Sequence, residues 1–98
     1  MTLAERSEVL DQAWALSPSV AVRPEPFGAL LYHFGTRRLR FLKRRDLADI
    51  VRGLADDGSA RATLGRAEVP PEQWPAYAAA LQALADTGMI ERRAEVAG

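Results

Sequence analysis

Few side chains in this sequence could carry out catalysis. There is no cysteine and only one histidine, so thiol chemistry is excluded and a metal site would need mostly carboxylate ligands. The acidic pair Asp56-Asp57 precedes Gly58-Ser59 and indicates a turn at a helix end. His33 lies among apolar or basic neighbours, which favours a structural or surface role over general-base catalysis. Since phosphate-binding glycine motifs are also missing, we expect a non-enzymatic protein without cofactor or metal.

A cluster of positive charge is the most prominent chemical feature. Six basic side chains fall within nine residues: Arg37, Arg38, Arg40, Lys43, Arg44 and Arg45. Such a cluster suits nucleic acid, a membrane surface or an acidic peptide, and it also suits a sheet edge protected by charge from aggregation. Over the whole chain, 13 Lys and Arg balance 13 Asp and Glu. We therefore expect neither nucleic acid nor membrane as a partner.

The size and composition predict one small domain. The chain has 98 residues, of which 48% are hydrophobic and 27% charged, as in ordinary globular proteins. We expect an N-terminal tail or short helix at 1–13, a domain at 14–93 and a C-terminal tail at 94–98. The N-terminus has no signal-peptide pattern and no run is long enough to span a bilayer. The lack of cysteine is compatible with a reducing compartment, and we expect a cytoplasmic protein.

Three strands are expected in the first half of the chain. Residues 17–26 predict an extended run that stops at Pro24, because proline removes a donor from the ladder. A hairpin follows around Gly35-Thr36, which suits a type II′ turn. Its register pairs Leu30 with Phe41 and Tyr32 with Leu39. These four residues are the expected core face, and the opposite face holds Ala29, Leu31, His33, Arg38, Arg40 and Leu42.

Three helices are expected in the second half. Leu47, Ile50, Val51 and Leu54 recur at helical spacing, a second helix covers 60–66, and a third runs from 71 to about 87, where Gly88 ends it. The last ten residues are expected to trail out, with Met89 and Ile90 packing on the core. The sequence thus predicts an α+β protein with a winged helix-turn-helix-like layout, in which a three-stranded antiparallel sheet precedes three helices.

Two functions remain open for this layout. A winged-helix DNA regulator would use 71–87 as its recognition helix, yet this segment contains no Lys or Arg. A peptide-binding protein would add an extended guest to the edge strand Arg38–Lys43, beside a helix presenting Tyr77, Leu81 and Leu84. Trp74 and Tyr77 could serve as binding anchors or as ordinary core residues. The second function fits the residues better.

The segments "AVRPEPFGALLYHFGTRRLRFLK" and "LADTGMIERR" resemble the mycofactocin peptide chaperone family. This family belongs to the RiPP recognition elements and is similar to the chaperone of pyrroloquinoline quinone biosynthesis. The resemblance implies a cofactor-free adaptor that binds a ribosomal precursor peptide and presents it to a radical S-adenosylmethionine maturase. It implies a peptide site at Arg38, Leu39, Arg40, Phe41, Leu42 and Lys43 with Tyr77, Leu81 and Leu84. We further hypothesise that the maturase docks either on the face of Leu31 and Leu42, which the expected core face would leave exposed, or on the "PEPFG" loop that contains Phe27.

Overall fold

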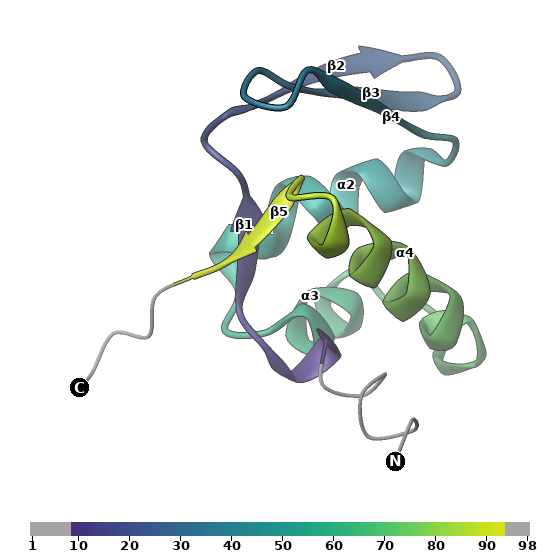
Figure 1. Ribbon diagram of the computed structural model, residues 1–98. Coiled ribbons are helices and arrows are strands. Elements are labelled where there is room, and N and C mark those ends of the chain that lie inside the picture. The colour runs from purple at the N-terminus through teal and green to yellow at the C-terminus, as the bar shows by residue number, and fades with distance from the viewer. Residues whose placement is uncertain (1–8, 94–98) are drawn as a thin grey trace.

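The computed structural model describes residues 9–93 and shows an α+β fold with two antiparallel sheets (Figure 1). The larger sheet has the order β2 (Val20–Glu25), β3 (Gly28–His33) and β4 (Arg38–Leu42). The smaller sheet pairs β1 (Trp14–Leu16) with β5 (Ile90–Arg92). The helical half consists of α2 (Arg45–Gly53), η1 (Leu54–Asp56), α3 (Ala60–Arg66), η2 (Pro71–Gln73) and α4 (Trp74–Asp86).

The hairpin register is confirmed, but the turn is different. Leu30 lies opposite Phe41 and Tyr32 opposite Leu39, as expected. The loop has four residues, 34–37, and the residue with positive φ is Arg37 (φ 62) rather than Gly35, so the type II′ turn was wrong. The single histidine stabilises this loop, since His33 Nδ1 accepts hydrogen bonds from the N–H groups of Gly35 (3.0 Å) and Thr36 (3.2 Å).

The expectation that Pro24 ends its strand was also wrong. Strand β2 continues to Glu25, and Pro24 lies opposite Ala29. Phe34 donates its N–H to the Ser19 carbonyl at 2.8 Å, so Ser19 and Phe34 form a hydrogen-bonded pair. Because such pairs alternate with non-bonded pairs along an antiparallel ladder, Pro24 falls at a non-bonded position. Its nitrogen faces away from β3, and no ladder bond is lost.

The expected core face of the larger sheet is reversed. Ala29 and Leu31 are fully buried and Leu42 is 5% exposed, whereas Leu39 and Phe41 are 53% and 58% exposed. The sheet rests on α2 through the face that was expected to be outside (Figure 1). Val20 and Val22 of β2 pair with His33 and Leu31 and pack against the core on this same side. Leu31 and Leu42 therefore do not lie exposed on the solvent side of the sheet, as the docking hypothesis for them assumed.

The helices agree closely with the periodicity of the sequence. Helix α3 has the expected bounds, and the side chain of Ser59 caps it by accepting the Ala62 N–H at 3.1 Å. Leu54, Leu64 and Leu81 are fully buried between the helices. The chain turns after α4 at Gly88, whose φ of 77 suits glycine.

The small β1–β5 sheet was not expected. Met89 and Ile90 are buried, as expected, but residues 90–92 do not trail out, because β5 pairs with β1. Trp14 begins β1, and its indole N–H donates to the Val9 carbonyl at 2.8 Å. Of the N-terminal segment 1–13, residues 9–11 are helical and residues 12 and 13 are not, while residues 1–8 lie outside the described residues, as do residues 94–98.

Candidate functional site

The outer edge of β4 has main-chain groups available for a further strand. Phe34 points its N–H at β2, so by strand alternation Ala29, Leu31 and His33 bond to β4. Their partners Arg38, Arg40 and Leu42 thus face inward along the ladder. The N–H and C=O groups of Leu39 and Phe41 face outward, and β4 has no further strand beside it among residues 9–93.

The other edge of this sheet is less suitable. The outward-facing positions of β2 are Val20, Val22 and Pro24. Val20 already donates its N–H to the Ser17 carbonyl at 3.0 Å, and Pro24 has no N–H. Only Val22 could donate to an added strand, whereas β4 offers two consecutive outward positions. The structure therefore favours β4 as the open edge.

An apolar groove of about 380 Å³ runs between β4 and α4. Leu39, Arg40, Phe41 and Leu42 form its strand side, and Leu47, Ala80, Ala83 and Leu84 form its helical side. The alanines leave room where α4 passes the strand. The groove could accept every second side chain of an extended peptide whose main chain bonds to the edge.

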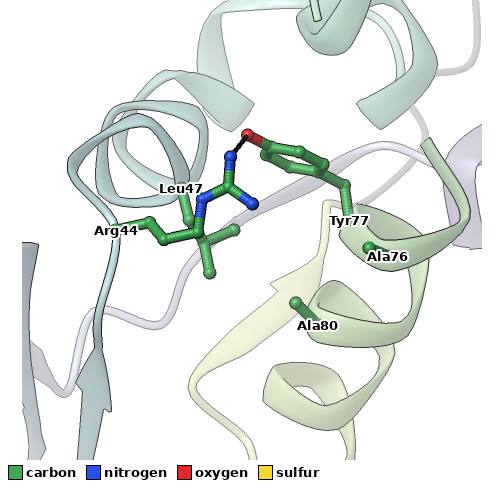
Figure 2. Close-up of a pocket in the computed structure, with 5 residues that line it drawn as sticks. All are labelled: Arg44, Leu47, Ala76, Tyr77 and Ala80. Carbon is green, nitrogen blue, oxygen red and sulfur yellow. Dashed lines mark hydrogen bonds between the residues drawn. The ribbon is translucent and has the colours of Figure 1, made fainter. Parts of the chain in front are cut away.

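A second hollow of about 200 Å³ continues the groove (Figure 2). It is lined by Arg44, Leu47, Ala76, Tyr77 and Ala80, and it shares Leu47 and Ala80 with the first. Figure 2 shows Arg44 and Tyr77 reaching toward each other across its rim. The two hollows together follow α4 from its first turn to Leu84.

A small polar network closes the end of the second hollow. Arg44 Nη2 donates to Asp46 Oδ2 at 2.6 Å and to the Tyr77 hydroxyl at 3.1 Å, and that hydroxyl donates to Asp46 Oδ2 at 2.7 Å. The hydrogen bonds from Arg44 and then Tyr77 lower the pKa of Asp46 to about 2. Burial, followed by the carboxylate of Asp46, raises the pKa of Tyr77. The network joins the start of α2 to α4, the two helices that supply the helical side of the groove.

The structure brings together most of the peptide-site residues expected from the sequence. Leu39, Arg40, Phe41, Leu42 and Leu84 line the groove, and Tyr77 lines its continuation. Arg38 begins β4 without lining either hollow, and Lys43 lines a hollow on the other side of the sheet. Leu81 is fully buried and contributes to the core beneath the groove.

Sequence reasoning missed Arg44, Leu47, Ala76, Ala80 and Ala83 as lining residues. The alanines lie at spacings of four and three along α4, which is one helical face. The alanine-rich run "AYAAALQALA" was the available signal. Trp74, which was considered as an anchor, lies at the start of α4, where its indole N–H donates to the Val69 carbonyl at 2.8 Å.

The basic cluster divides into two groups. Arg44 is engaged with Asp46, and Arg45 donates from Nε to the Pro26 carbonyl at 3.2 Å. Within residues 9–93, Arg37, Arg38, Arg40 and Lys43 form no ion pair. These four charges surround the open edge and remain available to acidic groups of a partner.

Residues 9–93 contain no cluster of three or more metal-ligating side chains. In the same range, no helix is long and apolar enough to cross a membrane. The feature that remains is an open strand edge beside an apolar groove, an arrangement that peptide-recognition modules use.

The fold and this groove define a small α+β protein with the features of a peptide-binding module, and sequence comparison agrees. The profile of the "Peptide chaperone MftB family" matches residues 13–91, and the chain belongs to this family. The protein named Peptide chaperone MftB from Mycolicibacterium smegmatis is 51% identical over 80 residues, covering 82% of this chain and 78% of that protein. Its namesake from Mycobacterium tuberculosis is 49% identical over 83 residues, covering 85% and 76%. No solved structure matches the chain significantly. The family resemblance is thereby confirmed.

Proposed function

We propose that this protein binds the precursor peptide of mycofactocin by strand addition and delivers it to a radical S-adenosylmethionine maturase. Family membership supports a peptide partner, since the relatives are named peptide chaperones. The observation that carries the binding mode is the outward edge of β4 beside the apolar groove.

In this mechanism the guest peptide extends the sheet by one strand. Its main chain bonds to the N–H and C=O groups of Leu39 and Phe41. Alternate side chains of the guest enter the groove against Leu47, Ala80 and Ala83. Main-chain bonds supply affinity for any extended segment, and the shape of the groove selects among side chains.

The available cations give the site its preference for acidic guests. Arg40 lies half-buried in the groove, while Arg38 and Lys43 are exposed at either end of β4. Charges placed around an interface accelerate encounter and exclude like-charged partners more than they raise affinity. We therefore propose that the bound segment carries carboxylates close to its paired residues.

The protein's part is to hold and release the peptide, with no chemistry of its own. We propose that it does so in the cytoplasm, without a cofactor, as a RiPP recognition element. The order of strands and helices supports a winged helix-turn-helix-like description of the domain. The alternative role in DNA binding gains no support, because α4 has no Lys or Arg side chain to contact a duplex.

Titration of the labelled protein with the mycofactocin precursor peptide tests this function. We expect the amides of Leu39 and Phe41 to exchange rapidly in the free protein and to become protected in the complex. The amides of Arg40 and Leu42 already bond to β3 and should change less. The Val22 amide on the opposite edge is the internal control. Protection at Val22 without protection at Leu39 and Phe41 would refute addition to β4.

A further inference from the structure

The side of the larger sheet that faces away from the helices has an extensive apolar surface. We call it the outer sheet face, and it comprises Phe27, Leu30, Tyr32, Phe34, Leu39 and Phe41. Four of these side chains are 43–60% exposed, an uncommon exposure for so many large apolar groups in one place. No element of residues 9–93 covers this side of the sheet (Figure 1).

Contacts among these side chains make the outer sheet face a continuous surface. The rings of Phe27 and Phe41 lie 6.0 Å apart, and those of Tyr32 and Phe34 meet edge-on at 5.2 Å. Leu30 and Leu39 are the direct cross-strand partners of Phe41 and Tyr32. Clustered aromatic side chains of this kind dominate the energetics of protein interfaces.

Positive charge borders the outer sheet face. Lys43 lines a hollow of about 490 Å³ with Phe27 and Phe41. Arg37 occupies the loop at the other end of β4, and neither cation forms an ion pair among the described residues. The acidic side chain nearest in the strands, Glu25, is bound to Arg23 at 3.3 Å. The surface therefore suits a partner with apolar side chains bordered by carboxylates.

A second copy of this chain and a membrane fit this surface less well. A two-fold dimer through one face brings the same residues of both copies together, so the cations bordering the face would repel one another. A membrane surface attracts proteins by about 1 kcal/mol for each basic residue near it, and two cations on a chain of zero net charge supply little. A protein partner with complementary charge fits best.

Strand β4 connects the outer sheet face with the peptide site. A guest strand added to β4 extends the same sheet, so every second guest side chain lies on the outer face beside Leu39 and Phe41. A protein docked there touches both the chaperone and the outward side chains of its guest. Its affinity then depends on whether the guest is present.

We propose that the outer sheet face is the docking surface for the enzyme that receives the guest peptide, and that this enzyme recognises chaperone and guest together. The proposal rests on the function proposed above. By linkage, the guest must raise the affinity for the enzyme by the same factor as the enzyme raises the affinity for the guest.

The test uses the full chain, the precursor peptide and the purified radical S-adenosylmethionine maturase. The double variant Phe27→Ser/Phe34→Ser alters two exposed side chains that do not line the groove. We expect its affinity for the maturase to fall by about tenfold or more and its affinity for the precursor to change by less than about twofold. The groove variant Leu47→Ser should lose affinity for the precursor. Its affinity for the maturase, measured without guest, should be nearly unchanged.

Charge and coupling are tested separately. In the absence of guest, Lys43→Glu should weaken maturase binding, whereas Arg92→Glu, an exposed charge on β5, should not. For the wild type, saturating precursor should strengthen maturase binding. Unchanged maturase affinity in the double variant, or a dimer or vesicle binding that the same variant abolishes, would overturn the docking surface. Failure of the wild-type chain to bind the precursor would instead overturn the proposed function.

Discussion

The hydroxyl of Tyr77 on α4 donates a 2.7 Å hydrogen bond to Oδ2 of Asp46, the second residue of α2. The two residues are 31 positions apart in sequence, and their contact joins the two helices that form the helical side of the groove. Arg44, which precedes α2, bonds to both groups. A polar contact thus joins the two helices on the helical side of the groove, whose lining residues there are apolar.

Tyr77→Phe removes this contact while keeping the ring. We expect the free energy of unfolding to fall by about 1 kcal/mol, as for a typical hydrogen bond, and precursor affinity to fall because α4 is less firmly placed. Urea denaturation and peptide titration measure the two effects. Tyr32→Phe, on the outer sheet face, is the control and should leave both within about 0.5 kcal/mol. Equal effects of the two substitutions would contradict the role assigned to Tyr77.

The lowered pKa of Asp46 predicts a loss of stability in acid. Its pKa in the folded protein is about 2, below its usual value of 3.8. The ionised carboxylate therefore stabilises the fold fully above pH 3.8, and this stabilisation is lost as the pH falls toward 2. The side chain is 51% exposed, and screening limits the contribution to about 1 kcal/mol or less. The free energy of unfolding, measured between pH 5 and pH 2, should decrease less for Asp46→Asn than for wild type.

Asp57 contributes in the same direction. Hydrogen bonds from Arg66 and then Thr63 lower the pKa of its carboxyl, so its stabilisation is also lost in acid. Asp57→Asn is therefore the parallel variant. In the double variant with Asp46→Asn, the free energy of unfolding should decrease still less between pH 5 and pH 2. If the free energy of unfolding decreased as much in the double variant as in wild type, groups other than Asp46 and Asp57 would be responsible for the loss of stability in acid.

Leu31 and Leu39 test the reversed sheet face directly. Leu31 is fully buried and Leu39 is 53% exposed, although they sit on neighbouring strands of one sheet. Leu31→Ala should cost about 2–5 kcal/mol of unfolding free energy, as buried leucines do, while Leu39→Ala should cost less than about 1 kcal/mol. Thermal or urea unfolding measures both. A larger loss of unfolding free energy for Leu39→Ala than for Leu31→Ala would support the core face that was expected from the sequence.

The sequence predicted the elements better than their orientation, for a physical reason. Alternation in the hairpin fixes which residues share a face, and the register was right. It does not fix which face is buried when both carry leucines. Strand β2 carries one signal, because Val20 and Val22 fall on the side of Leu31 and pack against the core, whereas Arg23 and Glu25 fall on the other side. That signal becomes visible only when all three strands are placed in register.

The groove-lining residues were harder to predict for a related reason. The large apolar stripe of α4, including Tyr77 and Leu81, packs into the core, because burial of large side chains drives folding. The groove takes the adjacent stripe of small residues, Ala76, Ala80 and Ala83. Strands β1 and β5 have three residues each and pair across almost the whole chain, so no local pattern indicates them.

Gly28 explains the "PEPFG" turn at the start of β3. Its φ is 154, and a Cβ there would collide with the carbonyl oxygen of Leu42 on β4. Gly28→Ala should therefore destabilise the protein by about 2 kcal/mol or more and loosen the sheet that presents the open edge. Gly65→Ala is the matched control, because nothing lies within 4 Å of its Cβ position in α3, and it should be neutral or stabilising by up to about 1 kcal/mol. Similar unfolding curves for the two variants would argue against the close approach at Leu42.

Arg40→Glu tests whether charge steers the guest. Arg40 lines the groove, is half-buried and forms no ion pair among the described residues, so its reversal breaks no salt bridge of these residues. We expect precursor affinity to fall by about threefold to tenfold at low ionic strength, with a smaller difference at high salt because the interaction is screened. Arg52→Glu, an exposed position of α2 that does not line the groove, controls for the change in net charge. Calorimetric titration at two salt concentrations separates the two variants. Undiminished affinity in Arg40→Glu would leave strand addition intact but would remove its electrostatic component.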